Sequence, residues 1–140
     1  MFILDTNVLS EMMSRKPAAP VAAWVAGQAG ENLFTVAVCQ AEIMSGLAIM
    51  PEGRRRQALE AAARAMFLED FAGRVLSFDT AAAIAYADIF AARRLAGRST
   101  ATLDLMIAAV ARVHRATVVT RDGSGFDGCG VAVINPWAGS

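Results

Sequence analysis

Apolar and polar residues follow one another along the chain in blocks that predict strands and helices in turn. Short apolar runs predict buried strands at 1–4, 33–35, 75–78, 117–120 and 131–134. Between them, apolar residues recur every three or four positions and predict helices over 8–13, 21–29, 37–50, 54–71, 80–96 and 102–114. This alternation predicts an α/β fold, a three-layer α/β/α sandwich with a mostly parallel central sheet, formed as a single domain over residues 1–140.

The first predicted strand ends abruptly at a carboxylate. The apolar run Met1–Leu4 is followed by Asp5 and then by Thr6 and Asn7, short polar residues that commonly begin a helix. In open parallel sheets, ligands bind in the crevice outside the carboxyl ends of the strands. We therefore expect Asp5 to lie at a functional edge of the sheet.

Composition excludes several classes of protein. The chain has 140 residues, of which 56% are hydrophobic and 19% charged, so it is long and apolar enough to bury its own core. Cys39 and Cys129 stand far apart and outside any CxxC pattern, which argues against a zinc site or a disulfide framework. Neither a secretory signal nor a membrane span is expected, so we predict a soluble cytoplasmic protein.

Four carboxylates stand in apolar surroundings: Asp5, Glu42, Asp104 and Asp122. Burying a carboxylate is costly unless it is paired, hydrogen-bonded or bound to a cation. Two of the four follow predicted strands and two lie on helices that must cover the sheet, so right-handed crossovers would bring them together. Clustered acids without a matching lysine predict a hard-cation site for Mg²⁺, with Mn²⁺ as the alternative.

Each acid also has an ordinary structural interpretation. Asp5 could only cap the helix that follows, and Glu42 could lie on a solvated helix face. Asp104 lies in the first turn of its helix, where a carboxylate interacts favourably with the helix dipole. Asp122 begins a turn, which is a common position for Asp. The four together favour a metal site more strongly than any one of them does.

The sequence resembles the PIN-domain ribonucleases over nearly its whole length, and in particular the FitB-like branch of the VapC-type toxins. The resemblance rests on five segments in order: Ile3–Glu11, the helix with Ala41-Glu42 and Gly46-Leu47, Asp104 with Ile107–Ala109, Val119–Asp122, and Val133–Trp137. It implies a Mg²⁺-dependent endoribonuclease that is the toxin of a type II toxin–antitoxin pair. The implied partners are an RNA substrate, a small cognate antitoxin and a second copy of the chain, with DNA contacted only through the antitoxin.

The resemblance also implies residue roles. Asp5, Glu42, Asp104 and Asp122 would be the catalytic acids, with Asp5 and Asp104 as the principal metal ligands and Glu42 and Asp122 as further ones. Thr6, Asn7 and Thr120 would orient the carboxylates by hydrogen bonds. Many relatives carry Asn where Asp122 stands and Asp three residues later. That later position is Gly125 here, so the fourth acid is assigned to Asp122.

Arginines supply nearly all the positive charge. The chain has 13 acidic and 13 basic residues, so nine acidic residues remain against 13 basic ones when the four acids are set aside. Twelve of the basic residues are Arg. Arginine suits phosphate recognition, and the candidates for RNA contact are Arg54, Arg55, Arg93, Arg94 and Arg121. Solvated helix ends would explain the clusters equally well, and an ion pair with Asp122 would explain Arg121.

A non-catalytic protein is the main alternative. A PIN-like binding module could act mainly in a DNA-bound regulatory complex with its antitoxin. Four retained acids disfavour it, because a pocket without catalysis has no physical need for clustered carboxylates. A receiver-like or phosphatase-like domain is a third possibility, but Asp5 begins no Asp-x-Asp motif and no lysine stands on a later strand.

Overall fold

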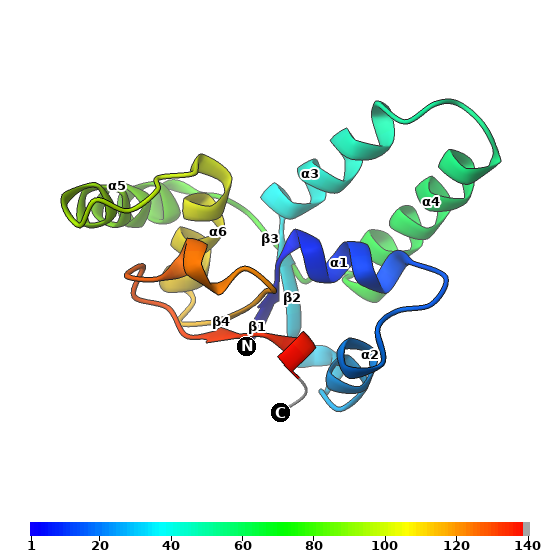
Figure 1. Cartoon of the computed structure of the whole chain (residues 1–140), viewed down its shortest axis with the longest axis horizontal. Helices are drawn as coiled ribbons and strands as arrows, with labels where there is room; N and C mark the ends of the chain where they lie inside the picture. Colours follow the sequence, from blue (N-terminus) through cyan, green and yellow to red (C-terminus); the bar gives the residue numbers. More distant parts are fainter. Residues whose placement is uncertain (139–140) are drawn as a thin grey trace.

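A five-stranded parallel sheet lies between two groups of helices in the computed structural model, which describes residues 1–138 (Figure 1). The strands are β1 (Phe2–Leu4), β2 (Leu33–Val36), β3 (Val75–Leu76), β4 (Thr117–Val119) and β5 (Val133–Ile134). Their order in the sheet is β3-β2-β1-β4-β5, and every neighbouring pair is parallel. The predicted α/β fold is therefore confirmed.

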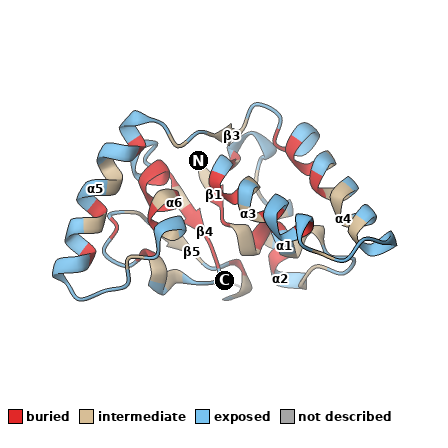
Figure 2. Ribbon diagram, turned by 90° about the horizontal axis from the view of Figure 1, so that it is seen from above, coloured by how far each residue is buried: buried red, intermediate tan, exposed pale blue. Residues whose placement is uncertain are grey.

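Helices cover both faces of the sheet. Two helices, α5 and α6, lie on one side and the other four on the opposite side (Figure 1), and Figure 2 shows the same division from above. The helices are α1 (Thr6–Met13), α2 (Ala19–Ala26), α3 (Ala37–Ala48), α4 (Arg54–Ala65), α5 (Thr80–Leu95) and α6 (Thr102–Val113). No helix among residues 1–138 is long and apolar enough to cross a membrane.

The order of the strands fixes where a ligand site can form. From β1 the chain proceeds outward to β2 and β3, and it then crosses the sheet to place β4 on the other side of β1. The direction of winding reverses between β1 and β4, and such a reversal leaves a crevice beyond the carboxyl ends of the two strands. Asp5 follows β1 and Thr120 follows β4, so both residues face this crevice.

The core accounts for the apolar runs. Ile3 and Leu4 of β1 and Val118 and Val119 of β4 are buried, as expected for parallel strands that are covered on both faces. The middle of helix α6 is buried, as the red segment in Figure 2 shows. The Thr35 hydroxyl, also buried, donates to the Leu4 carbonyl at 2.9 Å and so ties β2 to the end of β1.

The boundaries differ from the prediction in a few places. Helix α1 begins at Thr6, because Asp5 itself is the N-cap and accepts from the Thr6 N–H at 2.7 Å. Helix α2 ends before Gly27, three residues ahead of the predicted stop at Gly30. The predicted helix 54–71 is α4 followed by a π-helical turn at Met66–Asp70. These shifts lie at element ends, where local signals are weakest.

Candidate metal centre

The site begins with a hydrogen bond across the crevice between β1 and β4. Asp5 is only 6% exposed, and Thr120 is fully buried. The Thr120 hydroxyl donates to Asp5 Oδ2 at 2.8 Å, while the Thr6 N–H holds Oδ1. Both carboxylate oxygens are therefore held by groups at the ends of two adjacent strands.

Thr120 connects Asp5 to a second acid. Its hydroxyl oxygen accepts from the Asn7 side-chain amide at 3.2 Å and from the backbone N–H of Asp122 at 3.1 Å. The side-chain oxygen of Asn7, Oδ1, accepts in turn from the backbone N–H of Arg121. One hydroxyl thus links the first turn of α1 to the loop that carries Asp122.

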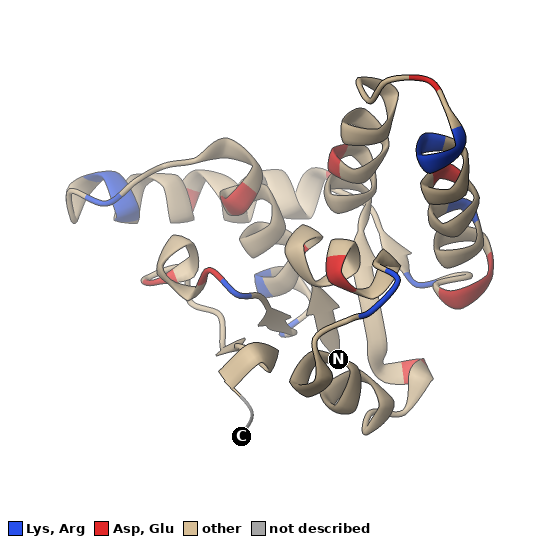
Figure 3. Ribbon diagram, turned by 45° about the vertical axis from the view of Figure 1, so that its right-hand side comes forward, with Lys and Arg blue, Asp and Glu red and all other residues tan. Residues whose placement is uncertain are grey.

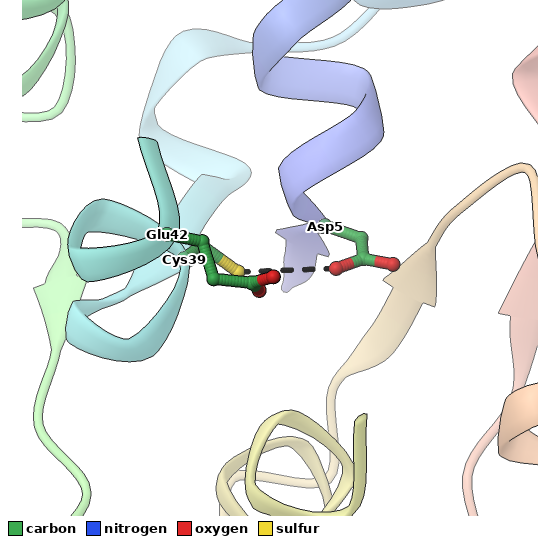
Figure 4. A group of neighbouring side chains, drawn as sticks. All are labelled: Asp5, Cys39 and Glu42. Atoms are coloured by element: carbon green, nitrogen blue, oxygen red, sulfur yellow. Dashed lines mark hydrogen bonds between the residues drawn. The ribbon is translucent and has the colours of Figure 1, made fainter. Parts of the chain in front are cut away.

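Glu42 approaches from α3, on the other side of Asp5. The Thr6 hydroxyl donates to Glu42 Oε1 at 2.8 Å. One turn earlier on the same helix, the buried Cys39 thiol points toward Asp5 (Figure 4) and lies 3.9 Å from Asp5 Oδ1. Ligand atoms of Asp5, Cys39 and Glu42 all lie within 4.8 Å of one another. Burial raises the pKa of Cys39 to about 12, so the thiol is neutral.

Asp104 and Asp122 meet at a short glycine-containing loop. Asp104 lies in the first turn of α6, and Asp122 precedes the 3-10 turn Gly123–Phe126. A Cβ placed on Gly125 would lie 3.0 Å from Asp104 Oδ2 and 3.7 Å from Asp122 Oδ2. Because Gly125 has no side chain, the space next to these two carboxylates is not filled by residue 125.

The four acids influence one another electrostatically. Burial raises the pKa of Asp104, and the charges of Asp5, Asp122 and Glu42 raise it further. Burial also raises the pKa of Asp5, which the hydrogen bond from Thr120 partly counteracts. Asp104 therefore lies within electrostatic reach of the other three carboxylates, Asp5, Glu42 and Asp122.

The donor set fits a hard divalent cation. Among residues 1–138 the ion pairs are Arg56–Glu60 and Arg98–Asp127, and neither includes any of the four acids. The cluster offers carboxylate oxygens from four chain segments, which are the ligands that Mg²⁺ and Mn²⁺ prefer. The neutral, soft Cys39 thiol is a poor ligand for such ions. A bound cation would offset both the burial and the carboxylate repulsion that raise the pKa values of Asp5 and Asp104.

The predicted RNA-contacting arginines fall in different places. Arg54 and Arg55 are the first residues of α4, whose start is coloured as basic in Figure 3. They line a groove of about 1180 Å³ between α1, α3 and α4 that reaches Thr6 and Glu42. Arg94 and Arg121 are exposed. These positions leave all four side chains accessible to a substrate.

Arg93 is an exception, because the structure does not place it on that surface. Its side chain is only 3% exposed. Its Nε donates to the Ser99 carbonyl at 2.6 Å, and its Nη1 donates to the Asp127 carbonyl at 2.5 Å and, more weakly, to that of Ser124 at 3.5 Å. Arg93 thus joins α5 to the segment before α6 and to the loop after Asp122, and it acts inside the fold rather than on RNA.

Several neighbours of the site were absent from the sequence-based prediction. Cys39 stands three positions before Glu42, a spacing that puts both on one helix face and could have revealed it. The Ser124 hydroxyl donates to Asp122 Oδ1 at 2.8 Å. Trp137 packs under the Arg121 guanidinium. Neither contact follows from a sequence pattern, because each depends on how a loop folds back.

Comparison with known proteins identifies relatives that span almost the whole chain. Plasmid stability protein StbB of Pseudomonas syringae pv. tomato is 44% identical over 98% of this chain and 99% of its own length. VapC ribonuclease Y4jK of Sinorhizobium fredii is 42% identical, with 98% of each chain covered. Toxin FitB of Neisseria gonorrhoeae is 38% identical over 98% of this chain and 99% of that toxin.

A solved structure and a family model agree with these relatives. The structure of FitAB bound to an IR36 DNA fragment superposes with a TM-score of 0.91 at 38% identity, covering 98% of this chain and 96% of that chain. The family model described as PIN domain matches residues 2–127. That span contains all four acids and the strands that position them. The chain therefore belongs to the PIN domain family.

Proposed function

We propose that this chain is a divalent-metal-dependent endoribonuclease and the toxin of a type II toxin–antitoxin pair. One observation carries the proposal: four carboxylates from separate segments meet at the crevice between β1 and β4, and three of them raise the pKa of the fourth, Asp104. The named relatives support the same conclusion, since they include a VapC ribonuclease and a toxin.

The proposed site divides the work among its residues. Asp5 and Asp104 are the principal ligands of Mg²⁺ or Mn²⁺, with Glu42 and Asp122 completing the set. When bound, the ion would neutralise the scissile phosphate and lower the pKa of a water molecule. Thr120 orients Asp5 and fixes the backbone of the Asp122 loop.

Glu42 and Asp122 are also the candidate bases. Either carboxylate can accept the proton of an attacking water, and the Thr6 hydroxyl fixes the position of Glu42. In-line attack on the phosphodiester would leave a 5′-phosphate and a 3′-hydroxyl. Asn7 supports both ends of this arrangement, because its amide donates to Thr120 and accepts from the backbone of Arg121.

The function is tested by RNA cleavage with Mg²⁺, with and without chelator. Asp5→Asn keeps the size of the side chain but removes a charged ligand, so cleavage should fall to the level seen with chelator. Asp88→Asn is the matched control, because Asp88 is an exposed carboxylate on α5 and does not contribute to the shifted pKa of Asp104. Equal cleavage by wild type and Asp5→Asn would disprove the assignment.

RNA would approach over the exposed arginines. Arg54 and Arg55 border the groove that leads to Glu42, and Arg94 is exposed at the end of α5. Arginines contact phosphates without reading sequence, so they would set affinity rather than choice of target. Arg54→Ala with Arg55→Ala should raise KM for RNA with little change in kcat, whereas a change confined to kcat would contradict this role.

The groove also fits a partner protein, and we assign it to a small antitoxin. Its walls combine apolar side chains of α1, α3 and α4 with Glu42 at one end, so a bound segment would reach the acids. The structure of FitAB bound to DNA supports contact with DNA through such a partner. The assignment is tested by co-purification with a small protein encoded beside this chain's gene, if such a reading frame is found; Ala58→Glu in the groove wall should weaken that co-purification.

We further propose a homodimer that acts in the cytoplasm. An apolar patch between α3 and α6 lies beside Glu42 and contains Val38, Ala41, Leu103 and Met106. The Met44 side chain nearby is 56% exposed, which is unusual for methionine and suits a covered interface. Light scattering should give the mass of two chains, and Met44→Glu should shift the mass toward one chain.

A further inference from the structure

Arg121 occupies a fixed position at the rim of the acidic cluster. It follows Thr120, the residue that holds Asp5, and precedes Asp122. Its backbone N–H donates to Asn7 Oδ1 at 3.2 Å, so the amide that supports Thr120 also anchors the main chain of Arg121. The exposed Arg121 side chain therefore starts from a backbone that the metal-site network holds in place.

The positive charge of Arg121 has no acidic partner in the part of the chain that the structure describes. The two ion pairs found there involve other residues, and the guanidinium N–H groups of Arg121 donate to no protein acceptor within residues 1–138. An ion pair with Asp122, the structural interpretation suggested by the sequence, is not formed. The N–H edge of this guanidinium is therefore free to bind an external anion.

The guanidinium of Arg121 lies over the ring of Trp137. The Arg121 Cζ lies 5.0 Å from the centroid of the Trp137 ring, a distance at which the ring quadrupole attracts a cation. Trp137 is itself anchored, because its backbone N–H donates to Asn135 Oδ1 at 2.9 Å and its 3-10 turn (Pro136–Ala138) packs against α2. A cation–π contact uses none of the guanidinium N–H donors, so these remain available for hydrogen bonds.

We infer that Arg121 and Trp137 form an RNA-phosphate contact at the rim of the metal centre. This inference rests on the proposed ribonuclease function. Four clustered carboxylates repel a polyanion, so a substrate strand needs a fixed cation close to them, and Arg121 directly precedes one of the four. Arg121 binds a phosphate beside the scissile one, and Trp137 is a positioning residue that restricts the guanidinium to the orientation required.

The test measures equilibrium binding of a short fluorescein-labelled single-stranded RNA to the full chain in chelator, where no cleavage occurs. Arg121→Ala should weaken binding about tenfold, as expected for one charge-assisted contact, and should lower the salt slope by about one. Arg64→Ala is the matched control, because Arg64 is exposed on α4 and donates no hydrogen bond within the described residues. It should bind like wild type.

Trp137→Leu should weaken binding about threefold, the size of one cation–π contact, and Trp137→Phe should weaken it less. If Trp137 acts through Arg121, Trp137→Leu has no further effect in the Arg121→Ala background. A merely structural role for Trp137 would weaken binding equally in both backgrounds and would overturn the inference. So would equal binding by Arg121→Ala and Arg64→Ala, or no RNA binding by wild type.

A separate assay distinguishes this inference from the proposed function. Wild-type chain that binds RNA in this Arg121-dependent way but does not cleave it with Mg²⁺ would refute the ribonuclease and retain the contact. Metal-dependent cleavage with no effect of Arg121→Ala on RNA affinity would refute only the contact. An effect of Arg121→Ala on antitoxin binding alone would assign the pair to the protein partner and reject RNA.

Discussion

Thr120→Val removes the hydroxyl that joins three parts of the candidate metal centre. That oxygen donates to Asp5 at 2.8 Å and accepts from Asn7 and from the Asp122 backbone. Valine replaces the hydroxyl by a methyl group of similar size, and the site is fully buried, so no water readily takes its place. The substitution therefore changes hydrogen bonding while leaving the shape of the packing nearly intact.

The loss can be sized from these contacts. A hydrogen bond to a charged group contributes about 1.5–3 kcal/mol. The Asn7 amide and the Asp122 N–H are only partly buried and can find water, so they add less. We expect Thr120→Val to lower the free energy of unfolding by about 2–3 kcal/mol at neutral pH. Thr120→Ser keeps the hydroxyl and should cost only about 1 kcal/mol for the lost methyl group.

The pH dependence gives the sharper test. Burial already raises the pKa of Asp5, and the hydrogen bond from Thr120 is the largest influence that lowers it. Without that bond the folded-state pKa rises further. A raised carboxyl pKa favours the folded chain at low pH, and this stability is lost as pH rises through the folded-state pKa. The gap between wild type and Thr120→Val should therefore widen from acidic to neutral pH.

Urea unfolding in chelator across that pH range measures the gap, and calorimetry with Mn²⁺ measures metal affinity. Thr120→Val should bind Mn²⁺ about 10–100-fold more weakly, as for other losses of a ligand-orienting hydrogen bond. Thr120→Ser should bind nearly as wild type does. Equal stability of the Val and Ser variants at neutral pH, or a gap that does not change with pH, would refute the role given to this hydroxyl.

Three further outcomes follow from the structure. Arg93→Met should lower the free energy of unfolding by about 2 kcal/mol in urea titrations, because the partly buried carbonyls of Ser99 and Asp127 lose their charged donor, whereas Met at the exposed Arg94 should change it little. The raised pKa of Asp104 means that the folded chain loses stability as pH rises and regains it on mild acidification. In chelator, acidification should therefore raise the melting temperature of wild type more than that of Asp104→Asn. Added Mg²⁺ should reduce this difference between the two proteins. Asp122→Asn should slow RNA cleavage about tenfold, and adding Gly125→Asp should restore part of the rate, because a Cβ at 125 points at the same carboxylates; a double variant no faster than Asp122→Asn would show that the two positions are not interchangeable.

The sequence predicted the fold and the meeting of the acids for a physical reason. Parallel strands are buried on both faces and appear as apolar runs, and a carboxylate directly after such a run, as at Asp5, marks the strand end. Glu42 and Asp104 were predicted from their isolation among apolar helix residues. Such signals are local, and the topology rules for crossovers are enough to bring the segments together.

Arg93 shows where the same reasoning failed. Adjacent arginines at a helix end resemble a solvated cluster, and only one of the two is solvated. The buried positions of α5 are Ala82, Ile89 and Arg93, with Tyr86 partly buried between them. These positions recur every three or four residues and so lie on one face of the helix, which includes Arg93 and excludes Arg94. The prediction did not ask which of the two arginines lies on the buried face of α5. Its carbonyl partners lie in loops, whose paths a residue pattern does not predict.

The two halves of the acidic cluster are held differently, and this difference has a functional consequence. Asp5 and Glu42 receive hydrogen bonds from Thr120 and Thr6, groups fixed by the ends of two strands. Asp104 receives no hydrogen bond within residues 1–138, and the exposed Asp122 carboxylate receives one, from Ser124. The first half is preorganised, whereas the second has few hydrogen bonds to hold its side chains and could adjust them around the proposed cation and phosphate. If the chain is the proposed nuclease, we expect an acid at position 125 to replace one at 122, because the adjustable half requires a carboxylate within reach more than a particular rotamer.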